Sequence, residues 1–251
     1  MNLDCSLPDV ACRPSPNYGE RKGNAQVDAV ILHYTGMPTG AAALDWLCNS
    51  DSQVSAHYFV DEAGSITQSV AEECRAWHAG KSFWKGETDM NSRSVGIEIV
   101  NPGPEGGYPD FPDNQIGAVI DLCRDILSRH DIPGERFLAH SDIAPGRKID
   151  PGEKFPWARL AVEGIGLWVE PSPIRGGRFF HEGDRGDPIE AVQAMLGLYG
   201  YDIDVTGLFD HKTKAVVSAF QRHFRPERTD GIADASTIET LARLLGELPF
   251  D

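Results

Sequence analysis

The fold of this chain follows from one short stretch, VDAVILHYTG at residues 27–36. A β-branched, apolar run of this length is typical of a buried strand, and this one stops at His33. A second run, SVGIEIV at residues 94–100, has the same character, and a shorter one at residues 136–139 ends at His140. The sequence thus places a histidine directly after two of its predicted strands.

Helical patterns alternate with these strands. We expect one helix to begin after Thr39 as its N-cap, and a longer amphipathic helix to be capped near Asp113. Residues 55–60 and 65–70 are expected to form a hairpin, and residues 1–26 an extended arm. Alternating strands and helices predict an α/β layer architecture.

The composition limits the class of protein and the partners that we expect. The chain has 251 residues, 41% hydrophobic and 24% charged, as in an ordinary globular protein. A net charge of −15 argues against nucleic acid as a partner. No apolar run is long enough for a membrane span, and residues 1–13 lack the pattern of a signal peptide. We therefore expect a cytoplasmic protein.

Five cysteines, an odd number with no Cys-x-x-Cys pair, argue against a disulfide framework and against a cysteine-rich zinc site. Cys48 and Cys123 fall in apolar helical patterns and are expected to be small core residues.

A change of composition near residue 171 predicts a second domain. Residues 1–170 form the first domain, the Pro- and Gly-rich residues 171–181 a linker, and residues 182–251 a small three-helix unit. Two turns of this unit are similar, Gly-x-x-Asp-x-x-Thr from Gly207 and again from Gly231, and each Asp is placed to cap the following helix.

Two of the eight histidines stand out, since His33 and His140 each follow a strand at the sheet edge where sites are built. Ten residues after His140, Asp150 lies in a loop stiffened by Pro and Gly. Two imidazoles, a carboxylate and an open fourth position are what a catalytic zinc site needs, although the long spacing makes the pattern only moderately specific. The other histidines are interpreted as structural: His57 as a core residue, and His130, His181, His211 and His223 as polar or helix-surface residues.

Two charged residues remain open to two interpretations. Glu98 interrupts an apolar strand, where a carboxylate is costly unless it is paired or functional, and the alternative is a side chain that faces solvent. Lys148 stands two residues before Asp150, and its alternative is an ordinary solvated loop lysine.

Five separated segments, in order, resemble the zinc-dependent N-acetylmuramoyl-L-alanine amidases, which share their fold with peptidoglycan recognition proteins and phage lysozyme-like amidases. The resemblance covers roughly residues 25–165. The segments are ILHYT at 31–35, SAHY at 55–58, AWHAG at 76–80, residues 91–98, and AHSDIAPGRKIDPG at 139–152 with FPW at 155–157.

The tail resembles a small three-helix peptidoglycan-binding domain, through Val192-Gln193, Phe220-Gln221 and Asp230-Gly231-Ile232. Its first turn departs from that pattern, with Thr206 where Asp is usual and Asp210 where Gly is common.

The resemblance implies a central mixed β-sheet flanked by helices, and one Zn²⁺ per chain bound by His33, His140 and Asp150. It implies that Glu98 is the general base and that Lys148 stabilises the transition state. The bond cleaved would join the lactyl group of N-acetylmuramic acid, or of its 1,6-anhydro form, to L-alanine of the stem peptide. Tyr34, Trp77, His78 and Asn91 are the candidate substrate contacts, and core packing is an equally good interpretation of Trp77.

Two alternatives to an amidase remain. Recognition proteins with this fold lose the metal, but here every ligand position is filled. Some phage-type lysins have Cys where this chain has Asp150. The expected partners are muropeptides or peptidoglycan; the tail suits intact polymer in the periplasm, against the cytoplasmic expectation. Removing residues 171–251 should spare cleavage of soluble muropeptides unless the tail belongs to the core of the catalytic domain.

Overall fold

The computed structural model describes residues 4–248 and centres on a six-stranded mixed sheet in the order β1-β5-β4-β7-β3-β8. Four neighbouring pairs, β1·β5, β4·β7, β7·β3 and β3·β8, are parallel, whereas β4 and β5 form the expected antiparallel hairpin. The bounds are β1 Ala11–Cys12, β3 Ala29–Tyr34, β4 Tyr58–Val60, β5 Ile66–Gln68, β7 Ser94–Ile99 and β8 Phe137–Ala139. Two further ribbons pair β2 Tyr18–Glu20 with β6 Cys74–Ala76, and β9 Phe179–Phe180 with β10 Ala233–Asp234.

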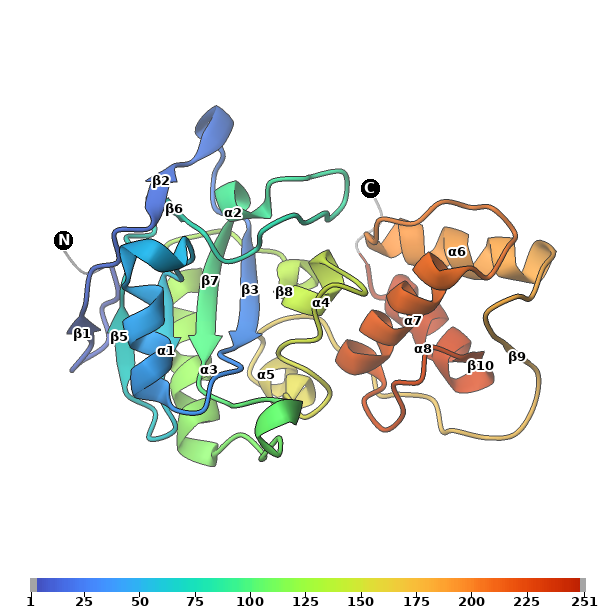
Figure 1. Ribbon diagram of the computed structural model, residues 1–251. Coiled ribbons are helices and arrows are strands. Elements are labelled where there is room, and N and C mark those ends of the chain that lie inside the picture. The colour runs from blue at the N-terminus through green and yellow to red at the C-terminus, as the bar shows by residue number, and fades with distance from the viewer. Residues whose placement is uncertain (1–3, 249–251) are drawn as a thin grey trace.

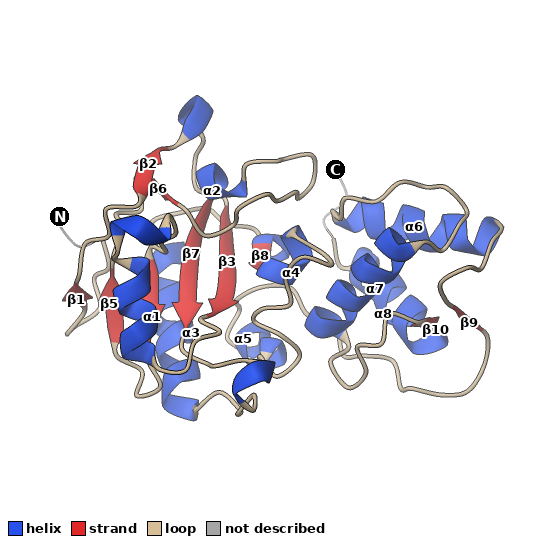
Figure 2. Cartoon of the chain, viewed as in Figure 1, coloured by secondary structure: helices blue, strands red, loops and turns tan. Residues whose placement is uncertain are grey.

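Helices cover both faces of the sheet, so the predicted fold class is confirmed (Figures 1 and 2). The helices of the first part are α1 Gly40–Leu47, α2 Met90–Arg93, α3 Asp113–Leu127, α4 His140–Ile143 and α5 Trp157–Val162. Those of the tail are α6 Asp187–Tyr199, α7 His211–Phe224 and α8 Ala235–Gly246. None of the described helices is both long and apolar enough to cross a membrane.

The helix starts follow from local capping chemistry. Thr39 caps α1 as expected, its hydroxyl oxygen accepting a hydrogen bond from the Ala42 amide at 3.2 Å. Helix α3 begins near Asp113 as expected: Pro112 is the N-cap and makes no side-chain capping bond, while Asp113 is the first helical residue. A carboxylate in the first turn still interacts favourably with the helix dipole.

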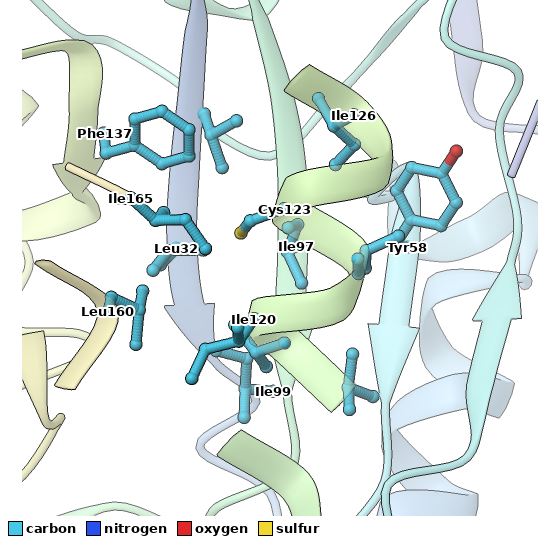
Figure 3. Packing of buried hydrophobic residues seen from close by; sticks show 14 of the residues in the cluster. Leu32, Tyr58, Ile97, Ile99, Ile120, Cys123, Ile126, Phe137, Leu160 and Ile165 are labelled. Carbon is cyan, nitrogen blue, oxygen red and sulfur yellow. The ribbon is translucent and has the colours of Figure 1, made fainter. Parts of the chain in front are cut away.

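The main core lies between the sheet and α3. Alternate residues of β3, such as Leu32, face this layer and pack with Ile120 and Cys123 of α3, as Figure 3 shows. Cys123 is therefore the core residue that its pattern predicted, whereas Cys48 is partly exposed. All five cysteines lie in the described part of the chain and are free thiols.

The tail shares a second core with the first part of the chain. One continuous apolar cluster contains Ile31 of β3, Trp84 and Ile143 together with residues of α6, α7 and α8. The Trp84 ring packs edge-on against two tyrosines of the tail, Tyr199 and Tyr201, with ring centroids 5.4 and 5.1 Å away. In Figure 1 the tail helices lie beside β8 and α4, and α4 packs against α7.

The segment predicted to be a linker is bonded to the tail at several of its residues, among them Ser172, Arg175 and the β9 residues. The amide of Ser172 donates to the Thr240 hydroxyl at 3.0 Å, and its carbonyl accepts from the Ser236 hydroxyl at 2.5 Å. Within the tail, Asp210 caps α7 and Asp234 caps α8, each accepting from an amide three residues on, as the near-repeat predicted.

Candidate metal centre and active site

Three electron-rich side-chain atoms from distant parts of the chain converge at one point. The Nδ1 atoms of His33 and His140 are 2.9 Å apart, and each is 3.0 Å from Oδ2 of Asp150. All three residues are buried. The two histidines and the carboxylate that the sequence singled out therefore form one compact group.

Sheet topology explains this convergence. Strands β3 and β8 are parallel, and their register pairs Leu32 with Ala139, so the residues that follow, His33 and His140, lie at the same edge. His140 opens the short helix α4 rather than the predicted loop. The loop after α4 returns Asp150 to this edge, and its carbonyl accepts a hydrogen bond from the Ser141 amide at 3.0 Å.

The donor set fits a cation. Nε2 of His140 lies 3.1 Å from the carbonyl oxygen of Ala79, which only accepts hydrogen bonds, so this nitrogen carries the proton of the neutral ring. A bare Nδ1 lone pair then faces the carboxylate of Asp150. Such atoms repel one another unless a positive charge lies between them. Their spacing is close to the edge of about 3.3 Å expected around a tetrahedral zinc ion with bonds of about 2.0–2.1 Å.

The environment favours the protonation states that bind metals. Burial, aided by the neighbouring His140, lowers the pKa of His33 to about 4, so its ring is neutral near pH 7. Burial alone would raise the pKa of Asp150, but the imidazoles of His140 and His33 beside it lower the pKa well below its ordinary value. Asp150 is therefore a carboxylate.

Glu98 lies next to His33 on the adjacent strand. The parallel register of β3 and β7 pairs these two residues directly. Burial, and then the negative charge of Asp150, raise the pKa of Glu98 to about 8, while Lys148 acts in the opposite direction. Among the described residues, the Oε2 atom of Glu98 is buried and has no hydrogen-bond partner. Because its raised pKa favours binding a proton and its Oε2 atom has no hydrogen-bond partner, this carboxyl group is suited to general acid–base chemistry.

These residues line one cleft of about 550 Å³. Lys148 is half-buried in its wall, on the loop between His140 and Asp150. Of the candidate substrate contacts, Tyr34 and Trp77 line the cleft as half-buried side chains with room to meet a ligand. Burial, followed by the charge of Asp150, raises the pKa of Tyr34 to about 12, so its hydroxyl stays protonated.

The other two candidates are buried and bonded within the protein. The Asn91 side-chain oxygen accepts hydrogen bonds from the amides of His78 and Ala79, at 3.0 and 2.8 Å. The imidazole of His78 borders the cleft, but its Nδ1 atom lies 3.0 Å from Nε2 of His33. Asn91 thus holds the backbone at His78 and Ala79, and His78 contacts the candidate metal ligand His33.

One residue of the tail was missed by the sequence interpretation. His223, interpreted as polar or helix-surface, is 1% exposed, and its Nδ1 donates to Asp142 on α4. Its ring stacks on Trp157, with centroids 3.7 Å apart. The signal was available, because His223 follows Val216 and Phe220 on the apolar face of α7 at helical spacing.

Comparisons with known proteins agree with this geometry. Residues 23–153 match a family model described as N-acetylmuramoyl-L-alanine amidase, and residues 185–241 match the model of a peptidoglycan binding domain. The chain is 37% identical over 233 residues to the N-acetylmuramoyl-L-alanine amidase AmiD of Escherichia coli, covering 84% of this chain and 80% of that protein.

Solved structures extend the likeness to both parts of the chain. The complex of E. coli AmiD with anhydro-N-acetylmuramic acid-L-Ala-D-γ-Glu-L-Lys has a TM-score of 0.76 at 36% identity, covering 95% of this chain and 94% of that one. AmpDh3 of Pseudomonas aeruginosa in complex with an anhydromuramic pentapeptide has a TM-score of 0.73 at 33% identity, covering 95% and 96%.

Proposed function

Because this chain belongs to the N-acetylmuramoyl-L-alanine amidase family, we propose that it cleaves its amide substrate with one zinc ion held by His33, His140 and Asp150. Bound zinc supplies Lewis acidity, which lowers the pKa of water and polarises a carbonyl oxygen. The two imidazoles and one carboxylate would hold the ion beside the cleft, with the donor set of a catalytic zinc site.

Glu98 carries the proton transfers in this proposal. Its carboxylate takes a proton from the attacking water and then delivers a proton to the amine nitrogen of the departing L-alanine. A general base works best when its pKa lies near the working pH, above the value of about 4.3 of an ordinary surface glutamate. The raised pKa of Glu98, about 8, supports the assignment.

Lys148 stabilises negative charge in this proposal and transfers no proton. Its side chain lines the same cleft, where negative charge develops on the carbonyl oxygen as the amide is attacked. A fixed positive charge in a partly water-excluded site stabilises that transition state more than the ground state.

The substrate class that we propose is the 1,6-anhydro muropeptide, cleaved between the lactyl group and L-alanine. Support comes from the two similar structures, whose ligands are anhydromuramyl peptides. Action on soluble muropeptides fits the cytoplasm, whereas action on intact polymer fits the periplasm, so substrate preference decides between the two compartments.

The observation that carries the proposal is the convergence of both imidazoles and the Asp150 carboxylate beside an unpaired Glu98. A non-catalytic recognition protein has no need for this set. Each bare donor atom buried there without a cation would lower the stability of the fold.

The test is a digest of two substrates, intact sacculi and a soluble anhydro-muropeptide, by purified protein with and without a zinc chelator. We expect stem peptide to be released from the soluble substrate, release to stop with chelator, and activity to return on adding zinc. A protein that contains zinc but releases peptide from neither substrate would be a recognition module instead. Faster release from sacculi would move the proposal to wall remodelling.

A further inference from the structure

The imidazole of His78 lies directly behind His33, on the side away from the metal-facing atom. Nε2 of His33 is 3.0 Å from Nδ1 of His78, and the two rings meet edge to face at 84°. Nε2 of His78 is 3.3 Å from the hydroxyl oxygen of Ser94. That hydroxyl in turn is 2.6 Å from the carbonyl oxygen of Met90.

The chemistry of each partner sets the direction of every hydrogen bond in this chain. The Met90 carbonyl only accepts, so Ser94 gives its proton there and offers a lone pair to His78. A neutral His78 therefore carries its proton on Nε2 and has a bare lone pair on Nδ1. His33 must donate to that lone pair from Nε2, which leaves its own Nδ1 bare and facing His140 and Asp150.

A glycine makes room for this arrangement. A Cβ atom built on Gly96 in β7 would lie 2.5 Å from Cγ of His78, closer than side-chain carbons approach in proteins. The backbone of Gly96 is extended, so its lack of a side chain serves this close approach rather than a turn. The strand thus leaves room for the imidazole of His78 beside His33.

Hydrogen bonds also hold the loop that carries His78 in place beside the two histidine ligands. Asn91 accepts from the amides of His78 and Ala79, and the Ala79 carbonyl accepts from Nε2 of His140 at 3.1 Å. One short segment therefore orients both imidazoles, His33 through a side chain and His140 through the backbone.

We propose that His78 is a positioning residue of the metal centre, which accepts the Nε2 proton of His33 and so fixes the tautomer and ring orientation that present Nδ1 to zinc. This inference rests on the proposed zinc site. It replaces the expectation that His78 contacts substrate. Loss of such a supporting partner typically lowers metal affinity about 10- to 100-fold.

The test compares His78→Leu with His78→Asn in the full chain by zinc competition with a chromogenic chelator. Leucine keeps the bulk but removes the acceptor, and we expect zinc to bind about 10- to 100-fold more weakly. The amide oxygen of asparagine can stand near the position of Nδ1, so we expect His78→Asn to recover most of the affinity. With cobalt in place of zinc, only His78→Leu should shift the visible absorption bands.

Trp77→Leu is the matched control, because Trp77 is the neighbouring residue and lines the same cleft. We expect it to raise KM and to leave zinc affinity unchanged. Gly96→Ala, which removes no polar group, should weaken zinc binding as His78→Leu does.

Each result decides between the two claims. A wild-type protein that binds no zinc overturns the proposed function and this inference together. Wild-type zinc binding with equal affinity in His78→Leu overturns the inference alone. Equal losses in His78→Leu and His78→Asn also overturn it, because ring packing rather than the hydrogen bond would then hold His33.

Discussion

Nδ1 of His223 lies 2.6 Å from Oδ2 of Asp142, and this hydrogen bond joins the C-terminal helices to the helix that begins with His140. The same carboxylate accepts from the Ala139 amide at 2.8 Å and from the Tyr201 hydroxyl at 2.7 Å. Of these three donors among the described residues, two come from the tail. The tail thus supplies partners for a buried acid two residues from a candidate metal ligand.

His223→Leu should destabilise the whole chain. Leucine fills much of the space but leaves the buried Asp142 carboxylate without one donor, which costs about 1–3 kcal/mol. Urea unfolding, followed by tryptophan fluorescence, measures the change. His211→Leu is the control, since this exposed histidine begins the same helix and should shift the unfolding free energy by less than about 0.5 kcal/mol. Equal, small effects of the two substitutions would contradict the role given to His223.

Removal of residues 171–251 should strongly destabilise the remaining amidase part. The sequence analysis expected soluble substrates to be cleaved still, unless the tail belonged to the core, and the shared apolar cluster meets that exception. Exposure of Trp84 and Ile143 alone would cost about 3–6 kcal/mol, a large share of a typical stability of about 5–15 kcal/mol. Near-ultraviolet circular dichroism and calorimetry check this. A fragment with the melting temperature of the full chain would show that the two parts are independent.

Glu98→Gln should keep zinc bound while kcat falls at least about 100-fold, the usual contribution of a general base. The amide is nearly isosteric but neither accepts nor delivers the required proton. Metal content by mass spectrometry and turnover of an anhydro-muropeptide are the measurements. Glu62→Gln, an exposed carboxylate in the β4–β5 turn, should leave both unchanged. Turnover near that of wild type in Glu98→Gln would rule out this role.

His140→Ala should lose both metal and activity. The substitution removes one of the three donor atoms and leaves two, which is too few for a tight zinc site. Equilibrium dialysis against zinc should give less than one ion per chain under conditions where the wild type is saturated. Full occupancy with retained hydrolysis would reject His140 as a ligand.

His57 should make the stability of the metal-free protein depend on pH. Burial, followed by the positive charge of Arg21, lowers its pKa to about 3, and its Nδ1 already accepts from the Gly96 amide at 2.9 Å. Between pH 6.5 and about 3, the unfolded chain therefore binds a proton that the folded chain excludes. The contribution of the neutral His57 to the free energy of unfolding is therefore complete above pH 6.5. It falls as the pH decreases, by up to about 1.4 kcal/mol per pH unit.

Urea unfolding at several pH values between 6.5 and 4.5 tests this, in wild type and in His57→Asn. Asparagine can still accept from the Gly96 amide but does not titrate, so its stability should fall less steeply with acid. Parallel curves for the two proteins would contradict the assignment.

Much of the fold was predictable because burial produces a simple pattern of apolar residues in the sequence. Strands β3 and β7 are covered on both faces, so they read as continuous apolar runs, and the polar His33 lies near the end of β3 at the sheet edge. The short α4 could not be predicted, because four residues are too few to show a helical period. The register that pairs His33 with Glu98 depends on tertiary packing and has no local signal.

The contacts that the sequence did not predict share one cause, which is that local composition does not report tertiary partners. Pro and Gly near residue 171 are typical of a free linker, yet Ser172 is buried and bonded to α8. The AWHAG motif that contains His78 is the same whether His78 faces substrate or supports a metal ligand. Only the distance to His33 separates the two roles.

The shared apolar cluster has a consequence for how this protein is made. It joins Ile31, near the beginning of the chain, to Leu244, near the end. A ribosome releases the first of these long before it has synthesised the second, so the sheet leaves the exit tunnel with one face uncovered. We expect the nascent amidase part to need protection by chaperones until α8 has been translated, unlike domains that fold one after another during synthesis.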